Sequence, residues 1–165
     1  MMDDVSLLEC AAGLATRASA VILEIRARGF SVERKEDRSV VTEADHAAEA
    51  LIVAALRATT PAIPVIAEEE VAGGRITAAS SLFWLVDPLD GTREFTSGSD
   101  DFAVNIGLVR EGRVALGVVA VPATGELFGG IVGQGAWKRV GGVQTAIHVR
   151  VPPAEGVTIV ASRHH

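Results

Sequence analysis

The sequence is poor in cysteine, aromatic residues and basic charge, and each shortage excludes a class of protein. Its only cysteine, Cys10, has no second thiol to pair with, so a disulfide or a cysteine-based metal site within one chain is excluded, and Cys10 is expected to be a small core residue. Tyrosine is absent and aromatic residues make up 4% of the chain, so the few rings are expected to serve packing. The net charge is −6, and no basic stripe exists to neutralise a phosphate backbone, which argues against binding to a nucleic acid polymer.

A basic leader and a long apolar run are also missing. The first residues, Met1-Met2-Asp3-Asp4, are acidic where a signal peptide needs positive charge, and no apolar run approaches the length of a membrane span. We therefore expect a cytoplasmic protein without an integral membrane segment. With 165 residues, 48% of them hydrophobic, the chain can bury a sizeable core.

Two segments have the three- and four-residue spacing of apolar side chains that is typical of amphipathic helices. The first covers residues 5–28 and ends at Gly29, a common helix-stopping residue. The second follows Thr42-Glu43-Ala44-Asp45, in which a capping hydroxyl precedes an acid at the spacing of a capping box, and it extends to about Thr59. The charged stretch 30–39 between the two helices lacks apolar periodicity and predicts a solvated strand or loop.

From residue 81 onward, the pattern changes to short apolar runs separated by turn residues. After an earlier short strand and a loop over 71–81, the predicted strands follow at hairpin-like intervals that favour antiparallel neighbours. The six predicted strands are Val65–Ala67, Leu82–Val86, Phe102–Arg110, Val114–Val121, Gly125–Val132 and Val157–Ala161. Two helices followed by a run of strands predict an α+β fold.

The densest chemistry lies in Trp84-Leu85-Val86-Asp87-Pro88-Leu89-Asp90-Gly91-Thr92-Arg93-Glu94-Phe95. The proline and glycine beside Asp87 and Asp90 allow a sharp turn that faces both carboxylates toward one point, where the Leu89 carbonyl offers a further oxygen. Mg²⁺ is typically held by a few carboxylates together with substrate phosphate. The free N–H groups of Gly91-Thr92 suit a phosphate oxygen, and the Thr92 hydroxyl suits a metal-bound water. The alternative is an ordinary solvated turn, for which Asp-Gly and Asp-x-x-Asp are common.

Two further acidic positions suit the same cleft, and each has a structural alternative. Glu68, with Glu69 beside it, follows a short apolar strand, but Glu68-Glu69-Glu70 also fits a solvated charge run. Asp45 lies in the first turn of a helix, where an acid favours the helix dipole and completes a capping box whatever the function.

Together, Val41-Thr42-x-x-Asp45, Glu68-Glu69 and Trp84-x-Val86-Asp87-Pro88-Leu89-Asp90-Gly91-Thr92 resemble the metal-dependent, lithium-sensitive phosphatases of the inositol monophosphatase superfamily. The continuation Arg93-Glu94-Phe95 is most similar to the 3′(2′),5′-bisphosphate nucleotidases of the CysQ type, since inositol phosphatases more often continue with uncharged residues. The resemblance implies a layered sugar-phosphatase-type fold, with two long helices packed on a largely antiparallel sheet. It also implies a Mg²⁺-dependent phosphoric monoester hydrolase of sulfur assimilation, which converts adenosine 3′,5′-bisphosphate to AMP and phosphate.

The resemblance assigns metal ligands residue by residue, for two or three Mg²⁺ ions in all. Glu68, Asp87 and the Leu89 carbonyl would hold one ion. Asp87 and Asp90 would share a second, and Asp45 would belong to a third, looser site.

The resemblance also assigns roles in the reaction. Thr92 and Glu68 would help to activate the attacking water, which makes them catalytic together with Asp87 and Asp90. The backbone amides of Gly91 and Thr92 would bind the substrate's phosphate. No covalent phosphoenzyme is required.

The chain departs from the family in length. Related enzymes continue into a second α/β domain with a Trp-Asp-x-Ala motif, whereas Trp84 and Trp137 are followed here by Leu85 and Lys138. We therefore expect residues 1–150 to form an N-terminal metal- and phosphate-binding domain, and residues 151–165, which include Pro152-Pro153, to form a linker and the start of a missing domain. Two alternatives stay open, an inositol or sugar monophosphatase and an inactive metal-binding fragment, and the oligomeric state, with a homodimer among the options, is left open too.

Overall fold

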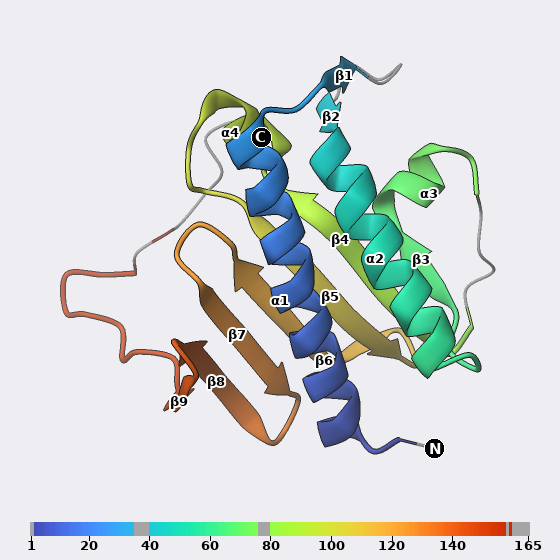
Figure 1. The fold of residues 1–165 in the computed structure, drawn as a ribbon. Helices are drawn as coiled ribbons and strands as arrows, with labels where there is room; N and C mark the ends of the chain where they lie inside the picture. The colour runs from blue at the N-terminus through green and yellow to red at the C-terminus, as the bar shows by residue number, and fades with distance from the viewer. Residues whose placement is uncertain (1, 35–39, 76–79, 158, 160–165) are drawn as a thin grey trace.

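A computed structural model describes residues 2–34, 40–75, 80–157 and 159. Two long helices lie side by side across one face of a seven-stranded sheet, which confirms the predicted α+β class (Figure 1). The elements in chain order are α1 Asp4–Arg28, β1 Val32–Arg34, β2 Val40–Thr42, α2 Glu43–Thr59, β3 Val65–Ala67, α3 Glu68–Ala72, β4 Leu82–Asp90, α4 Thr92–Ser97, β5 Ala103–Arg110, β6 Arg113–Val121, β7 Glu126–Ile131, β8 Gly135–Val140 and β9 Val143–Ile147. The large sheet follows the order β3 to β9; β3 and β4 are parallel, and every other neighbouring pair is antiparallel.

Helix α1 supplies much of the core. Its N-terminus is capped by Asp3, whose carboxylate accepts a hydrogen bond from the Ser6 N–H at 2.8 Å, and it ends at Gly29 with φ of 84°, as predicted. By length and composition α1 could cross a membrane, with a mean hydropathy of 1.4, so the expectation that no segment approaches a span was wrong. Its apolar side chains, however, form the core against α2 and strands β5 to β7, which is the behaviour of a core helix in a soluble protein.

Helix α2 begins with the predicted capping box. The Thr42 hydroxyl accepts a hydrogen bond from the Ala44 N–H at 3.1 Å, and Asp45 accepts one from the Thr42 N–H at 2.7 Å. The helix packs over β3 and β4. At the C-terminal end of the helix, the fully buried Trp84 donates its indole N–H to the Thr60 hydroxyl at 3.0 Å. This arrangement fixes β4, the strand that carries the acidic motif, against α2.

Most predicted strands are present, and the differences have simple causes. Strand β4 continues past the predicted end at Val86, through an irregular register between Asp87 and Asp90. Strands β8 and β9 were not predicted, because both are largely exposed and their sequences lack a regular apolar alternation. In the predicted strand 157–161, Val157 and Ile159 lie outside the helices and strands, and the other three residues fall outside the described part of the chain.

Candidate active site

The acidic positions singled out in the sequence meet where β3 and β4 end. These strands run parallel, and Ala67 pairs with Val86. The next residue in each segment is therefore an acid: Glu68, which begins α3, and Asp87 within β4, so the two carboxylates lie side by side. The parallel pairing alone thus joins two segments that lie far apart in the sequence.

Three carboxylates interact at this edge. The side chains of Asp87 and Glu68 lie within hydrogen-bonding reach of each other. Burial, followed by the negative charges of Glu68 and Asp90, raises the pKa of Asp87 to about 7, while the Leu89 N–H, which donates to the Asp87 carboxylate at 3.2 Å, acts in the opposite direction. Asp90 is exposed and accepts a hydrogen bond from the Asn105 side chain at 3.3 Å. This is a site of concentrated negative charge.

Thr92 links the acidic motif to helix α2. Its hydroxyl oxygen lies 3.0 Å from Asp45 Oδ1 and 3.1 Å from the Leu89 carbonyl oxygen. The Asp45 carboxylate therefore serves both interpretations made from the sequence, because Oδ2 completes the capping box with Thr42 while Oδ1 faces the site. Asp45 is buried, which raises its pKa, and its hydrogen bonds with Thr42 and Thr92 oppose that shift.

Gly91 permits the tight turn between β4 and α4. It adopts the left-handed conformation with φ of 89°, and a side chain at this position would meet the Asp101 carbonyl oxygen at 2.8 Å. The helical turn expected after Gly91 is present as α4. The structure thus brings every predicted site residue to one region: Asp45, Glu68, Asp87, Leu89, Asp90, Gly91 and Thr92.

Glu49 is a buried carboxylate that the sequence interpretation missed. From α2, its two oxygens accept hydrogen bonds from the Glu69 N–H at 2.7 Å and the Glu70 N–H at 2.9 Å, so it caps α3 and fixes the position of Glu68. Burial raises the pKa of Glu49, and the two backbone hydrogen bonds oppose the shift. One signal was available: Glu49 follows Asp45 by four residues and therefore lies on the same face of α2.

The alternative of a solvated charge run does not describe the second and third acids of Glu68-Glu69-Glu70. Glu69 is buried, and Glu70 forms ion pairs with Arg57 at 2.7 Å and Arg75 at 2.8 Å. The hydrogen bond from Arg57 is the main cause of the lowered pKa of Glu70. These contacts hold α3 in place and so fix the backbone position of Glu68, its first residue.

The donor set fits a hard cation by its chemistry. Carboxylates and a backbone carbonyl are the oxygen ligands that Mg²⁺ prefers. Among the described residues, no three His, Cys, Asp or Glu side chains are already arranged as a metal site. Burial and the neighbouring negative charges raise the pKa of Asp87, so this carboxyl group binds a proton more readily than usual. A divalent cation would compete with a proton for the Asp87 oxygens.

Comparisons with known proteins all point to one family of phosphatases. The family model described as "Inositol monophosphatase family" matches residues 3–164. The chain is 39% identical to the 3′(2′),5′-bisphosphate nucleotidase CysQ of Salmonella typhimurium over 161 residues, which is 96% of this chain and 64% of that protein's length. It is 38% identical to inositol monophosphatase 3 of Solanum lycopersicum over 131 residues, 79% of this chain and 49% of the relative.

Solved structures share the fold. The Thermotoga maritima IMPase aligns with a TM-score of 0.73 at 28% identity, over 91% of this chain and 54% of that one. CysQ from Bacteroides thetaiotaomicron aligns with a TM-score of 0.65 at 35% identity, over 82% of this chain and 49% of that one.

Proposed function

Because the chain belongs to the inositol monophosphatase family, we propose that it carries the metal- and phosphate-binding part of a Mg²⁺-dependent phosphatase. The proposed reaction removes the 3′(2′)-phosphate of adenosine 3′,5′-bisphosphate and yields AMP and phosphate. The observation that carries this proposal is the convergence of Glu68, Asp87, Asp90 and the Thr92–Asp45 pair where β3 and β4 end. The similarity to CysQ of Salmonella typhimurium favours the nucleotide substrate.

Glu68, Asp87 and the Leu89 carbonyl would hold one Mg²⁺, Asp87 and Asp90 a second, and Asp45 a third. When bound, such ions neutralise phosphate charge and make water a stronger nucleophile at neutral pH. The ion count, two or three, is part of the proposal.

The chain's own groups have distinct tasks in this proposal. Glu68 and the Thr92 hydroxyl orient the attacking water, and the Glu68 carboxylate takes up its proton. The backbone N–H groups of Gly91 and Thr92 hold a phosphate oxygen and keep the phosphorus in line with the water. Asp45 holds the Thr92 hydroxyl in place at 3.0 Å.

The chain spans 64% of the length of CysQ from Salmonella typhimurium, so its division into parts is also a proposal. Residues 1–150 would form the metal- and phosphate-binding domain, and residues 151–165 would form a linker and the start of a second α/β domain. The exposure of Val149 and Val151, 99% and 87%, supports a boundary here, because neither side chain packs on the sheet. The cytoplasmic location and a homodimer remain predictions.

A second candidate is an inositol or sugar monophosphatase. The similarity to inositol monophosphatase 3 of Solanum lycopersicum and to the Thermotoga maritima IMPase favours it. A third candidate is an inactive metal-binding fragment, because the match covers only part of each relative.

The three candidates can be separated by measuring phosphate release with Mg²⁺, with and without Li⁺, from adenosine 3′,5′-bisphosphate and from inositol 1-phosphate. Faster, Li⁺-sensitive release from the nucleotide supports the main proposal, and faster release from inositol 1-phosphate supports the second. Folded protein that binds Mg²⁺ in calorimetry but hydrolyses neither substrate is the result expected of a fragment.

A further inference from the structure

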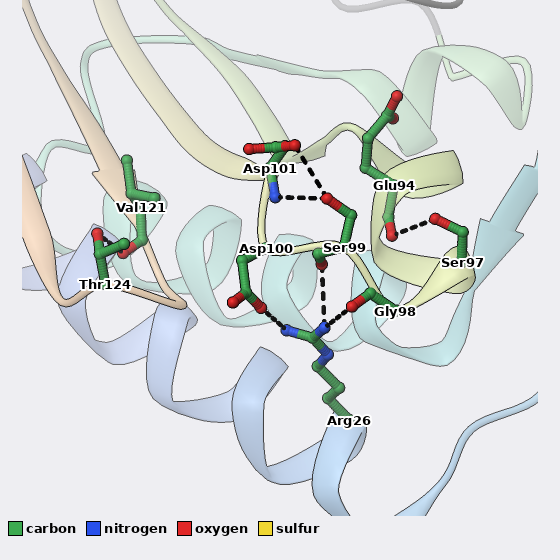
Figure 2. A network of polar contacts seen from close by, with 9 residues as sticks. All are labelled: Arg26, Glu94, Ser97, Gly98, Ser99, Asp100, Asp101, Val121 and Thr124. Carbon is green, nitrogen blue, oxygen red and sulfur yellow. Dashed lines mark hydrogen bonds and ion pairs between the residues drawn. The ribbon is translucent and has the colours of Figure 1, made fainter.

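Arg26, in the last turn of α1, ties this helix to the loop that follows α4 (Figure 2). Its guanidinium donates to the Gly98 carbonyl at 2.8 Å, to the Ser99 carbonyl at 3.0 Å and to the Asp100 carboxylate at 2.8 Å. The same group lies over the ring of Phe102, 5.1 Å from its centroid. One side chain therefore contacts three successive residues and the nearby Phe102, in a segment more than seventy residues away.

The backbone carbonyls contribute more to this contact than the ion pair does. Asp100 is 71% exposed, so its pairing with Arg26 is screened by water and is weak. The Gly98 and Ser99 carbonyls, in contrast, follow the end of a short helix, where carbonyl groups lack intrahelical partners and a cation is favoured by the helix dipole. Arg26 Nη2 donates to both carbonyls while Nη1 donates to Asp100, an arrangement that the forked geometry of a guanidinium allows.

The loop held by Arg26, residues 98–101, packs against the turn that carries Gly91. The Asp101 carbonyl lies directly against Gly91, and α4 connects Gly91 to the loop within a few residues. The buried Phe95 of α4 packs against Phe102, with ring centroids 5.2 Å apart. A shift of the loop must therefore move the turn that carries Gly91 and Thr92.

We infer that Arg26 is a positioning residue for the phosphate-binding turn, acting through the 98–101 loop and not by contact with substrate. This inference rests on the proposed function, because Gly91 and Thr92 are taken to bind phosphate. Arg26 makes the amides of this turn available in one fixed arrangement and so removes an ordering cost from substrate binding.

The test compares Arg26→Met with Arg139→Met in the whole chain. Methionine keeps an unbranched apolar stem and removes the guanidinium. Arg139 is a matched control because it also ties another element to α1, through Glu9 at 3.0 Å, and also lies over an aromatic ring, that of Trp137, at 4.5 Å. It comes from β8, which carries none of the proposed site residues.

Two measurements are made on each variant, hydrogen exchange of the amides of residues 92–98 and the dissociation constant of inorganic phosphate in the presence of Mg²⁺. In Arg26→Met, we expect exchange to be about tenfold faster, the effect of losing a charge-assisted hydrogen bond. We expect phosphate to bind at least about fivefold more weakly. Arg139→Met should change neither, and Arg26→Lys, which keeps the charge but not the fork, should recover part of both.

The results distinguish the role of Arg26, which holds the 98–101 loop in place (the Arg26 clamp), from the proposed function of the chain. If amide hydrogen exchange in Arg26→Met is unchanged, Arg26 does not hold the loop in place. If exchange is faster but the affinity for phosphate is unchanged, Arg26 does not position the phosphate-binding turn. An equal loss of affinity in Arg139→Met would show a general stability effect and overturn the role as well. Absence of phosphate binding by the unaltered chain would overturn the proposed function, while the exchange experiment would still decide whether Arg26 clamps the loop.

Discussion

The substitution Gly91→Ala tests whether the turn at the end of β4 is sterically required. Two separate costs apply at this position. Gly91 has φ of 89°, a conformation that costs a residue with a Cβ about 1–2 kcal/mol. In addition, the new Cβ would lie 2.8 Å from the Asp101 carbonyl oxygen, which is backbone and cannot rotate away.

The second cost is an overpacking cost of about 1–3 kcal/mol. Together the two give a loss of unfolding free energy of about 2–5 kcal/mol, a large share of the roughly 5–15 kcal/mol typical of a domain. A domain of this size loses about 2–4 °C of melting temperature for each kcal/mol, so a decrease of about 4–20 °C is expected from these values.

Gly98→Ala is the matched control. Gly98 has nearly the same φ, 85°, but nothing lies within 4 Å of a Cβ built there, so it measures the conformational cost alone. The assay is urea unfolding monitored by circular dichroism. The comparison requires that the unfolding free energy of both variants falls with urea concentration at the same slope. Effects of independent substitutions on unfolding free energy typically add to within about 0.5 kcal/mol. If the two variants lose the same unfolding free energy within this margin, the contact with Asp101 imposes no constraint and the steric argument is refuted.

Three further predictions follow from contacts described above. Asp87→Asn should weaken Mg²⁺ binding in calorimetry by at least about tenfold and nearly abolish turnover in a form that includes the second domain; retained turnover at saturating Mg²⁺ would contradict the ligand assignment. Since the folded-state pKa of Asp87 is raised to about 7 from 3.8, the folded chain binds a proton that the unfolded chain releases, and its stability in EDTA should fall as pH rises through 7. A melting temperature that is higher at pH 6 than at pH 8, with a weaker dependence in Asp87→Asn, is expected. Thr60→Val leaves the buried Trp84 N–H without its acceptor and should cost about 1–3 kcal/mol in urea unfolding; a loss below the lower bound would place another acceptor near the indole.

The two long helices and the central strands could be predicted because their signals are local. The apolar spacing of α1, its glycine stop and the capping box of α2 depend only on neighbouring residues, and all three are present in the structure. Strands β8 and β9 lack such a signal, because they gain stability from hydrogen bonds to neighbouring strands more than from burial of their side chains. The expectation about membrane spans failed for a related reason, since a core helix and a spanning helix share length and composition.

The residues of the candidate site could be predicted from the sequence. The residues that hold the surrounding backbone in place could not. Asp45, Glu68 and the acidic motif could be identified by residue type and order. Arg26 could not be identified, and Glu49 could be recognised only as an acid on the same helix face as Asp45. Each acts on backbone groups of a distant segment, and only the tertiary structure shows which backbone groups those are. A glutamate on a helix or an arginine at a helix end is unremarkable in sequence.

The parallel pairing of β3 and β4 has a consequence for how the chain folds. Strands β5 to β9 form successive antiparallel neighbours, which can assemble through short loops. In contrast, β4 is joined to β5 through a segment that includes α4, and β3 is joined to β4 through a segment that includes α3. Loop closure of this kind contributes to high contact order and slows folding. Glu68 therefore meets Asp87 only after the non-local step is complete. Capacity to bind Mg²⁺ should consequently appear late in refolding, after the strand meander has formed, and would make the cation a reporter of the finished fold.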